Sequence, residues 1–287
     1  MIEEIATCLL VFMSSKARSL DDLLYLMDRL RDPISGCPWD LKQSFESIVP
    51  CTLEEVYEVI GAIENKNFDH LKEELGDLLF QIVFYSKIAD EKSLFNFDDI
   101  VSSVTQKLIS RHPHVFPKGT LKSKDSSPKS NKDNSYREKI WESLKSIERK
   151  KRGQNSTLSD ISSTLPALIR AQKIQKRAAS VGFDWKSPDE VFAKINEKIT
   201  ELHEAVDMDN KKCVEEELGD TMFTMVNLCK HLNVDAETAL RGASNKFEQR
   251  FKNIESRIHD AGESMIDLAP ERLESLWSEV KDKISSE

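Results

Sequence analysis

A duplicated segment is the feature of this sequence that most constrains its fold. The run Glu-Glu-Leu-Gly-Asp at residues 73–77 recurs at residues 216–220, which is an offset of 143 positions. The same offset relates Phe80 to Phe223 and Val83 to Val226. Because self-similarity of this length indicates that one structural unit has been duplicated, we expect two tandem domains, over residues 20–150 and 165–285.

Both copies have the apolar spacing of helices. In residues 52–63 and 71–88 apolar side chains recur every three or four positions, the period of one buried stripe on an α-helix. Sustained alternation of apolar and polar residues, which would indicate strands, is not found. Because helices of this length cannot bury such a stripe alone, we expect bundles that also pair across a homodimer. The sequence therefore predicts an all-α fold of two tandem helical-bundle repeats.

Composition and charge argue against several classes of function. The 287 residues carry 50 acidic and 41 basic side chains, which gives a net charge of −9. Binding to nucleic acid by counterion release needs a basic surface, so nucleic acid is not an expected partner. The five cysteines form no C-x-x-C pair, which argues against a disulfide framework or a thiolate zinc site. The apolar run near the N-terminus is too short to span a bilayer, and we expect a cytoplasmic protein without a membrane partner.

The segment between the two copies, residues 117–152, is rich in Ser, Lys and Asn. Its first part, residues 117–135, has too few apolar side chains to order itself and is expected to form a mobile loop. The positive charge of the segment fits either a solvated linker or a stretch that attracts anionic substrates or RNA.

Acidic residues gather on one face of each of two successive helices. Because each helical residue advances by about 100°, Glu54, Glu55 and Glu58 share one sector of the first helix. Glu74 and Asp77 share a face of the next helix, and the residues between allow the chain to return antiparallel. Converging carboxylates repel one another unless a cation neutralises them, and all-oxygen ligands suit Mg²⁺ or Mn²⁺. One such cluster alone fits an ordinary solvated face, but its recurrence at the same spacing favours a metal site.

Basic and aromatic residues follow the acidic cluster in each copy. A Lys and an Arg one helical turn apart can both contact a polyphosphate, although the same spacing suits an ordinary surface pair. A Trp later in each copy can stack on a nucleobase or anchor the core of a closing helix. These residues are Lys107, Arg111 and Trp141 in the first copy, and Lys246, Arg250 and Trp277 in the second.

The acidic motifs and their flanking segments resemble the two-repeat bacterial MazG-type nucleoside triphosphate pyrophosphohydrolases, which are all-α enzymes that depend on Mg²⁺. The resemblance implies hydrolysis of a nucleoside triphosphate to the monophosphate and pyrophosphate, which clears surplus or noncanonical nucleotides. The alternative is a non-catalytic interaction module that responds to nucleotides or metal. The further segments that carry the resemblance are Gly-Cys-Pro-Trp-Asp at 36–40, Arg-His-Pro-His-Val-Phe at 111–116, Leu-Pro-Ala-Leu-Ile-Arg-Ala-Gln-Lys at 165–173 and Val-Gly-Phe-Asp-Trp at 181–185.

The resemblance also implies roles for individual residues. Glu54, and Glu197 in the second repeat, lie beside the implied metal ligands, where they can orient or deprotonate the attacking water. The implied metal ligands are Glu55, Glu58, Glu74 and Asp77 in the first repeat, and Glu201, Glu217 and Asp220 in the second. The implied nucleotide-contacting residues are Lys107, Arg111, Trp141, Lys194, Lys246, Arg250 and Trp277.

The second repeat departs from the family pattern at Lys198, which stands where the second glutamate of the motif belongs. An ammonium group at this position removes one metal ligand and adds a cation. It either pairs with Glu201 or Asp220 in place of a second metal ion, or abolishes Mg²⁺ binding in this repeat. We therefore expect the first repeat to hold the better metal site.

Overall fold

The computed structural model describes residues 18–122, 153 and 156–285, and every regular element in this part of the chain is helical. The predicted all-α class is therefore confirmed. The chain separates into two compact units, one ending at Asn134 and the other beginning at Ser135. The predicted end of the first domain at residue 150, and most of the loop predicted over residues 117–135, lie outside the described residues.

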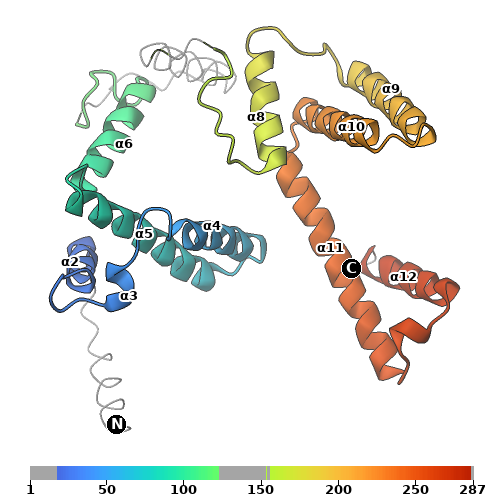
Figure 1. Ribbon diagram of the computed structural model, residues 1–287, viewed down its shortest axis with the longest axis horizontal. Helices are drawn as coiled ribbons and strands as arrows, with labels where there is room; N and C mark the ends of the chain where they lie inside the picture. Colours follow the sequence, from blue (N-terminus) through green and yellow to red (C-terminus); the bar gives the residue numbers. More distant parts are fainter. Residues whose placement is uncertain (1–17, 123–152, 154–155, 286–287) are drawn as a thin grey trace. The chain divides into compact units, whose positions relative to one another are not determined.

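A helical hairpin, α4 and α5, is the centre of the first unit (Figure 1). The helices α2 and α6 both pack against α5. Side chains satisfy the free backbone groups at the starts of these helices, because Ser19 and Asn96 form capping boxes on α2 and α6. The helices of this unit are α2 (Leu20–Leu30), α3 (Pro38–Leu41), α4 (Val49–Glu64), α5 (Phe68–Glu91) and α6 (Phe97–Arg111).

A second helical hairpin, α9 and α10, is the corresponding feature of the second unit (Figure 1). The helix α8 packs against α10, and α11 packs against both α8 and α12. The elements of this unit are α8 (Ala167–Ala179), α9 (Pro188–Asp207), α10 (Lys211–His231), α11 (Ala236–Asp260), the short 3₁₀ helix η1 (Met265–Asp267) and α12 (Pro270–Ser285).

The two hairpins turn in the same way. Lys66 and Asp209 are both in the left-handed region, with φ of 53° and 49°. The next residue in each turn, Asn67 or Asn210, caps the second helix by accepting a hydrogen bond from a backbone N–H. These turn positions are also 143 residues apart, so the duplication seen in the sequence corresponds to one repeated helical hairpin.

The buried core of the first unit lies towards the C-terminal half of α5. Val83, Phe84 and Ile88 of that helix are each 1% exposed and pack with Met27 and Ile48. Glu74 and Asp77 lie in the N-terminal half of the same helix, so the core leaves that end of the hairpin available for a polar site. The second unit has two smaller core clusters, one of Val191, Ile195 and Leu228, and one of Ile254, Ile258, Leu276 and Val280.

Within one chain, much of the apolar stripe on the α4–α5 hairpin remains exposed. Leu53 and Ile63 on α4 are 55% and 54% exposed, and Leu75 on α5 is 50% exposed. The periodicity therefore identifies the helices correctly, but the described part of one chain does not bury the stripe. The hairpin has the form of half of a four-helix bundle.

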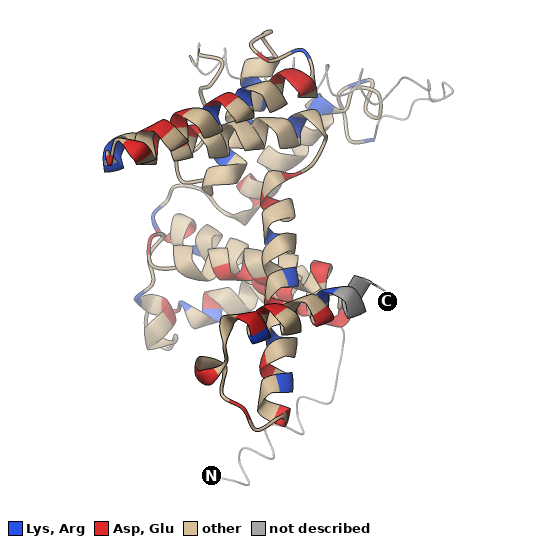
Figure 2. Cartoon of the chain, turned by 90° about the vertical axis from the view of Figure 1, so that its right-hand side faces the viewer, with Lys and Arg blue, Asp and Glu red and all other residues tan. Residues whose placement is uncertain are grey.

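Acidic and basic residues are distributed along the helices (Figure 2). Acidic and basic residues recur at short intervals along the sequence of these helices, so the helices contain no long uninterrupted apolar run. None of the described helices is both long enough and apolar enough to cross a bilayer.

Candidate metal and nucleotide site

Three glutamates of the first hairpin converge on one point. Glu55 and Glu58 lie one turn apart on α4, and Glu74 lies on the facing part of α5. One carboxylate oxygen from each of them lies within 4.8 Å of the other two. The antiparallel packing of α4 and α5 thus brings together acidic faces that are 16 residues apart along the chain.

The site is short of positive charge. Burial raises the pKa of Glu55, and the neighbouring carboxylates of Asp77, Glu58 and Glu54 raise it further, although a hydrogen bond from Gln81 lowers it. Burial also raises the pKa of Glu74, as does the carboxylate of Glu58, although His70 lowers it. These shifts mean that the ionised carboxylates are less stable here than in water, so a cation bound among them would relieve their repulsion.

The donor set fits a hard divalent cation. An Mg²⁺ ion binds oxygen ligands at about 2.1 Å, so two ligands on opposite sides of its octahedron lie about 4.2 Å apart. The longer metal–oxygen distances of Ca²⁺ allow a larger separation between ligands. The spread of 4.8 Å among Glu55, Glu58 and Glu74 is close to this range, so small side-chain rotations suffice. Asp77 and Glu54 lie near enough to act on the pKa of Glu55. The first hairpin could therefore hold a divalent metal ion.

Sequence reasoning missed two side chains that contact the cluster. His70 Nε2 lies 3.1 Å from Glu74 Oε1, and Gln81 Nε2 donates a long hydrogen bond of 3.5 Å to Glu55 Oε1. Helical spacing could have identified both, because His70 precedes Glu74 by four residues and Gln81 follows Asp77 by four.

The predicted phosphate-binding residues of the first repeat lie on a different helix from the carboxylates. Lys107 and Arg111 are in the last turns of α6, which starts after the C-terminal end of α5. Glu74 and Asp77 are in the first half of α5. In Figure 1, α6 leads away from the α4–α5 hairpin rather than back along it. Trp141 lies outside the described residues.

The equivalent place in the second hairpin holds a lysine. Lys198 Nζ lies 2.7 Å from Glu201, 3.0 Å from Glu217 and 2.8 Å from Asp220. Hydrogen bonds to Asp220, Glu201 and Glu217 raise the pKa of Lys198 well above its ordinary value. The hydrogen bond from Lys198 in turn lowers the pKa of Glu201, which is the opposite of the shift at Glu55 and Glu74.

The remaining predicted residues of the second repeat form two groups. Lys194 Nζ lies 2.5 Å from Glu197, its neighbour one turn along α9. The guanidinium of Arg250 lies 5.8 Å from the ring centre of Trp277, and Phe247 packs against the same ring at 5.2 Å. Trp277 also packs against the core cluster of α11 and α12, so it is at least partly a core anchor. The nucleotide-contacting roles of these residues, and of Lys246, stay predictions.

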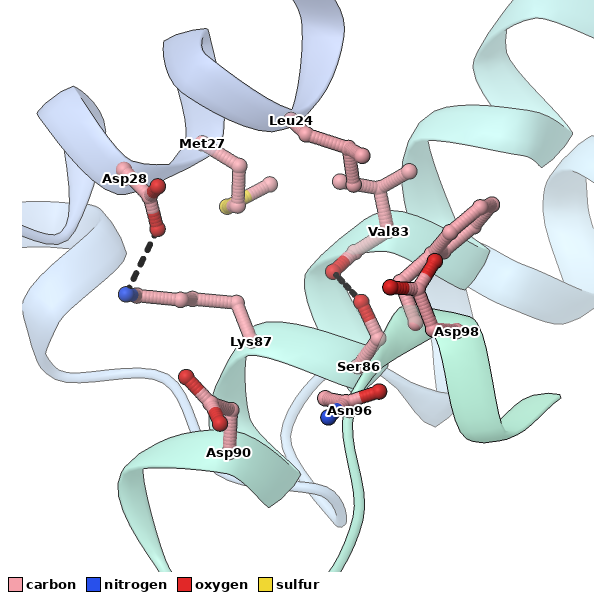
Figure 3. Close-up of a pocket in the computed structure, with 10 residues that line it drawn as sticks. Leu24, Met27, Asp28, Val83, Ser86, Lys87, Asp90, Asn96 and Asp98 are labelled. Carbon is pink, nitrogen blue, oxygen red and sulfur yellow. Dashed lines mark hydrogen bonds and ion pairs between the residues drawn. The ribbon is translucent and has the colours of Figure 1, made fainter. Parts of the chain in front are cut away.

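A lysine near the opposite end of the second helix is also repeated. Lys87 Nζ lies 2.6 Å from Asp28 of α2, at the edge of a cavity of about 200 Å³ between α2, α5 and the start of α6 (Figure 3). The equivalent Lys230 forms an ion pair with Asp184, which precedes α9. Each pair ties the segment before the hairpin to the second helix of the hairpin, and we assign it a structural role.

Known proteins match this sequence over both repeats. The family model described as the MazG nucleotide pyrophosphohydrolase domain matches twice, at residues 43–116 and 186–254. A protein of Escherichia coli (strain K12) named nucleoside triphosphate pyrophosphohydrolase is 47% identical over 91% of this chain and 97% of its own length. A protein of Thermotoga maritima named nucleoside triphosphate pyrophosphohydrolase/pyrophosphatase MazG is 43% identical over 91% of this chain and 95% of its own length. The two matched segments contain the α4–α5 and α9–α10 hairpins.

Proposed function

The chain belongs to the MazG nucleotide pyrophosphohydrolase family, and from this premise we propose that its first repeat is the catalytic one. The chain is accordingly an enzyme, a nucleoside triphosphate pyrophosphohydrolase. We propose that the reaction depends on Mg²⁺, for which Mn²⁺ can substitute, and that it yields a nucleoside monophosphate and pyrophosphate. The observation that carries this proposal is the convergence of Glu55, Glu58 and Glu74.

Four carboxylates of the first hairpin would hold the metal ion: Glu55, Glu58, Glu74 and Asp77. A bound Mg²⁺ supplies positive charge to the triphosphate and lowers the pKa of a coordinated water. The packing of α4 on α5 fixes the backbone positions of these side chains before substrate arrives, so little reorganisation is needed on binding.

Glu54 is the proposed general base. The oxygen of a water molecule forms a bond to the α-phosphorus, while the bond between that phosphorus and the oxygen bridging to the β-phosphorus breaks. Pyrophosphate leaves, and the carboxylate of Glu54 holds the proton that the water releases. Glu197 has the equivalent position in the second repeat, where it is paired with Lys194.

Lys107 and Arg111 are proposed to neutralise the leaving pyrophosphate. Glu91 follows Asp77 by fourteen positions in α5, which corresponds to roughly 21 Å along the helix. Because α6 starts beyond that end, we infer that Lys107 and Arg111 act on the carboxylates of a second copy rather than on those of their own chain. We therefore propose a homodimer in which α6 of one protomer completes the site of its partner.

The exposed apolar stripe of the hairpin supports the same homodimer. Leu53 and Ile63 on α4 and Leu75 on α5 lie about half exposed in one chain. A second copy that presents the same stripe would complete a four-helix bundle through a self-complementary contact.

The proposed physiological role is removal of surplus or noncanonical nucleoside triphosphates in the cytoplasm. Hydrolysis to the monophosphate and pyrophosphate withdraws a triphosphate from the substrates available to polymerases. The resemblance stated for the sequence motifs supports this role.

A pyrophosphate-release assay tests the proposal. The full chain is incubated with Mg²⁺ and a mixture of nucleoside triphosphates, in parallel with Glu58→Gln and Glu201→Gln. We expect Glu58→Gln to lose at least 100-fold in rate and Glu201→Gln to stay within a few-fold of the native chain. The reverse pattern would assign catalysis to the second repeat, and no turnover in any preparation would favour the non-catalytic module.

A further inference from the structure

The second hairpin retains most of the acidic motif of the first but adds a cation at its centre. We propose that Lys198 permanently takes the place of the metal ion in the second repeat, so that each chain binds divalent metal in its first repeat only. This inference rests on the proposed metal site of Glu55, Glu58 and Glu74.

Three carboxylates surround the ammonium group of Lys198. A lysine ammonium has three N–H donors, and carboxylates of Glu201, Glu217 and Asp220 lie within 3.0 Å of Nζ. These three carboxylates are the ones that the family resemblance implies as metal ligands. The side chains of Lys198 and Glu217 are only 15% and 26% exposed, so solvent screens this pair less than it screens surface pairs.

A metal ion would have to displace this ammonium. The substitution removes a carboxylate at the position that Glu55 has in the first repeat, which leaves fewer ligands. An ion bound among the remaining three would lie within a few ångströms of a like charge, unless Lys198 moved away and left its own charge unpaired. Both arrangements lose favourable electrostatic energy that the present one retains.

The charges within the two acidic groups also differ. In the first hairpin the carboxylates of Glu55, Glu58 and Glu74 converge on one point, whereas in the second the ammonium of Lys198 lies among the carboxylates of Glu201, Glu217 and Asp220. The second group therefore already contains a cation.

Lys198 also holds the second hairpin together. It lies on α9 with Glu201, whereas Glu217 and Asp220 lie on α10, so its ion pairs join the two helices. Glu197, the candidate base of this repeat, is paired with Lys194 instead. The second hairpin is thus closed without metal, and its role is to support the fold rather than to hydrolyse substrate.

Counting bound Mn²⁺ tests the inference directly. Free Mn²⁺ is measured by electron paramagnetic resonance during titration of the full chain without nucleotide, with Lys198→Glu and Lys252→Glu as variants. Lys252 makes an exposed pair with Glu248 on α11, so its replacement is a matched charge reversal away from the cluster. We expect one tight site per chain in the native protein and in Lys252→Glu, and two in Lys198→Glu.

A second set of variants keeps the test valid if Lys198→Glu does not fold. In the same titration we expect Glu58→Gln to lose the single tight site and Glu201→Gln to keep it. Two tight sites in the native chain, or loss of the single site in Glu201→Gln but not in Glu58→Gln, would overturn the inference. So would a folded Lys198→Glu chain, judged by circular dichroism, that gains no site.

The metal count and the activity assay fail independently. A native chain with one Mn²⁺ site and no pyrophosphate release would refute the proposed function and leave the inference standing. A native chain that binds two Mn²⁺ ions and releases pyrophosphate would overturn the inference and leave the proposed function standing.

Discussion

Lys198 of α9 lies at the position that Glu55 has in α4, and its ammonium lies among the carboxylates that correspond to the neighbours of Glu55. Glu55 is 143 residues earlier, and both side chains are three residues before a glutamate that faces the other helix of the hairpin. In the first hairpin the acidic group stays short of positive charge, whereas in the second one lysine pairs with Glu201, Glu217 and Asp220. The second hairpin thus relieves its carboxylate repulsion with a lysine, and we propose that the first hairpin does so with a metal ion.

Replacing Glu55 by Lys should convert the first site into a copy of the second. The new ammonium can pair with Glu58, Glu74 and Asp77, so we expect Glu55→Lys to lose the tight Mn²⁺ site and at least 100-fold in pyrophosphate release. Without metal, we expect its melting temperature to rise by a few degrees, because the carboxylates are neutralised internally.

Scanning calorimetry with and without Mg²⁺ measures this stability change, and Glu55→Gln is the control. The amide removes one carboxylate without adding a cation, so it should lose activity with a smaller gain in melting temperature. A Glu55→Lys chain that still releases pyrophosphate at the native rate would contradict the proposed site.

A charge placed in the exposed stripe of the first hairpin should separate the proposed homodimer. Ile63 is 54% exposed on α4, and a lysine there would be buried against the same stripe of a partner. We expect light scattering to give the dimer mass for the native chain and the monomer mass for Ile63→Lys at micromolar concentration. Leu94, which is 62% exposed just after α5, provides the control Leu94→Lys, which should stay dimeric. A monomeric native chain would refute the homodimer.

Asp184 should stabilise the second unit in a pH-dependent way. Burial alone would raise its pKa, but the hydrogen bond and charge of Lys230, with help from Asn227 and His231, hold the pKa below its ordinary value of 3.8. A lowered pKa means that the stabilisation is present above the unfolded-state value and disappears as pH falls through the folded-state value. We expect Asp184→Asn to lose about 3 kcal/mol at pH 7, because Lys230 is left buried without its partner.

Urea unfolding as a function of pH measures the Asp184 contribution. The difference between native chain and Asp184→Asn should be constant from pH 7 to about pH 5 and should shrink below about pH 4. The exposed Asp189 provides the control Asp189→Asn, which should differ little from the native chain at pH 7. A difference that does not change with pH would show that the ion pair is not its source.

The partly buried ion pair between Arg31 and Glu91 should contribute more to stability than an exposed ion pair. Arg31 is 5% exposed at its side chain and donates two hydrogen bonds, of 2.8 and 2.6 Å, to the Glu91 carboxylate. We expect Glu91→Gln to lower the free energy of unfolding by about 2 kcal/mol, since it removes the charge opposite a buried guanidinium. Glu248→Gln, which removes the charge opposite Lys252 in an exposed pair, should lower the free energy of unfolding by less than about 0.5 kcal/mol. Equal losses in urea titrations of the two variants would contradict this ranking.

The local structure of both hairpins could be predicted from the sequence. A helical backbone turns by about 100° per residue whatever it packs against, so the acidic faces at Glu55 and Glu58 and at Glu74 and Asp77 follow from spacing alone. The repeated offset predicted that one hairpin occurs twice, and the matching turns at Lys66 and Asp209 confirm this.

Only the tertiary structure decided which side chains meet across helices. The place of Lys198 in the repeated motif predicted its pairing with Glu201 or Asp220 as one of two alternatives, and the packing of α9 on α10 added Glu217 as a third partner. Packing likewise left Leu53 and Leu75 exposed in one chain, although their periodicity is that of a buried stripe. Distances within one helix follow from its backbone hydrogen bonds, whereas distances between helices depend on how all the side chains of the interface fit together.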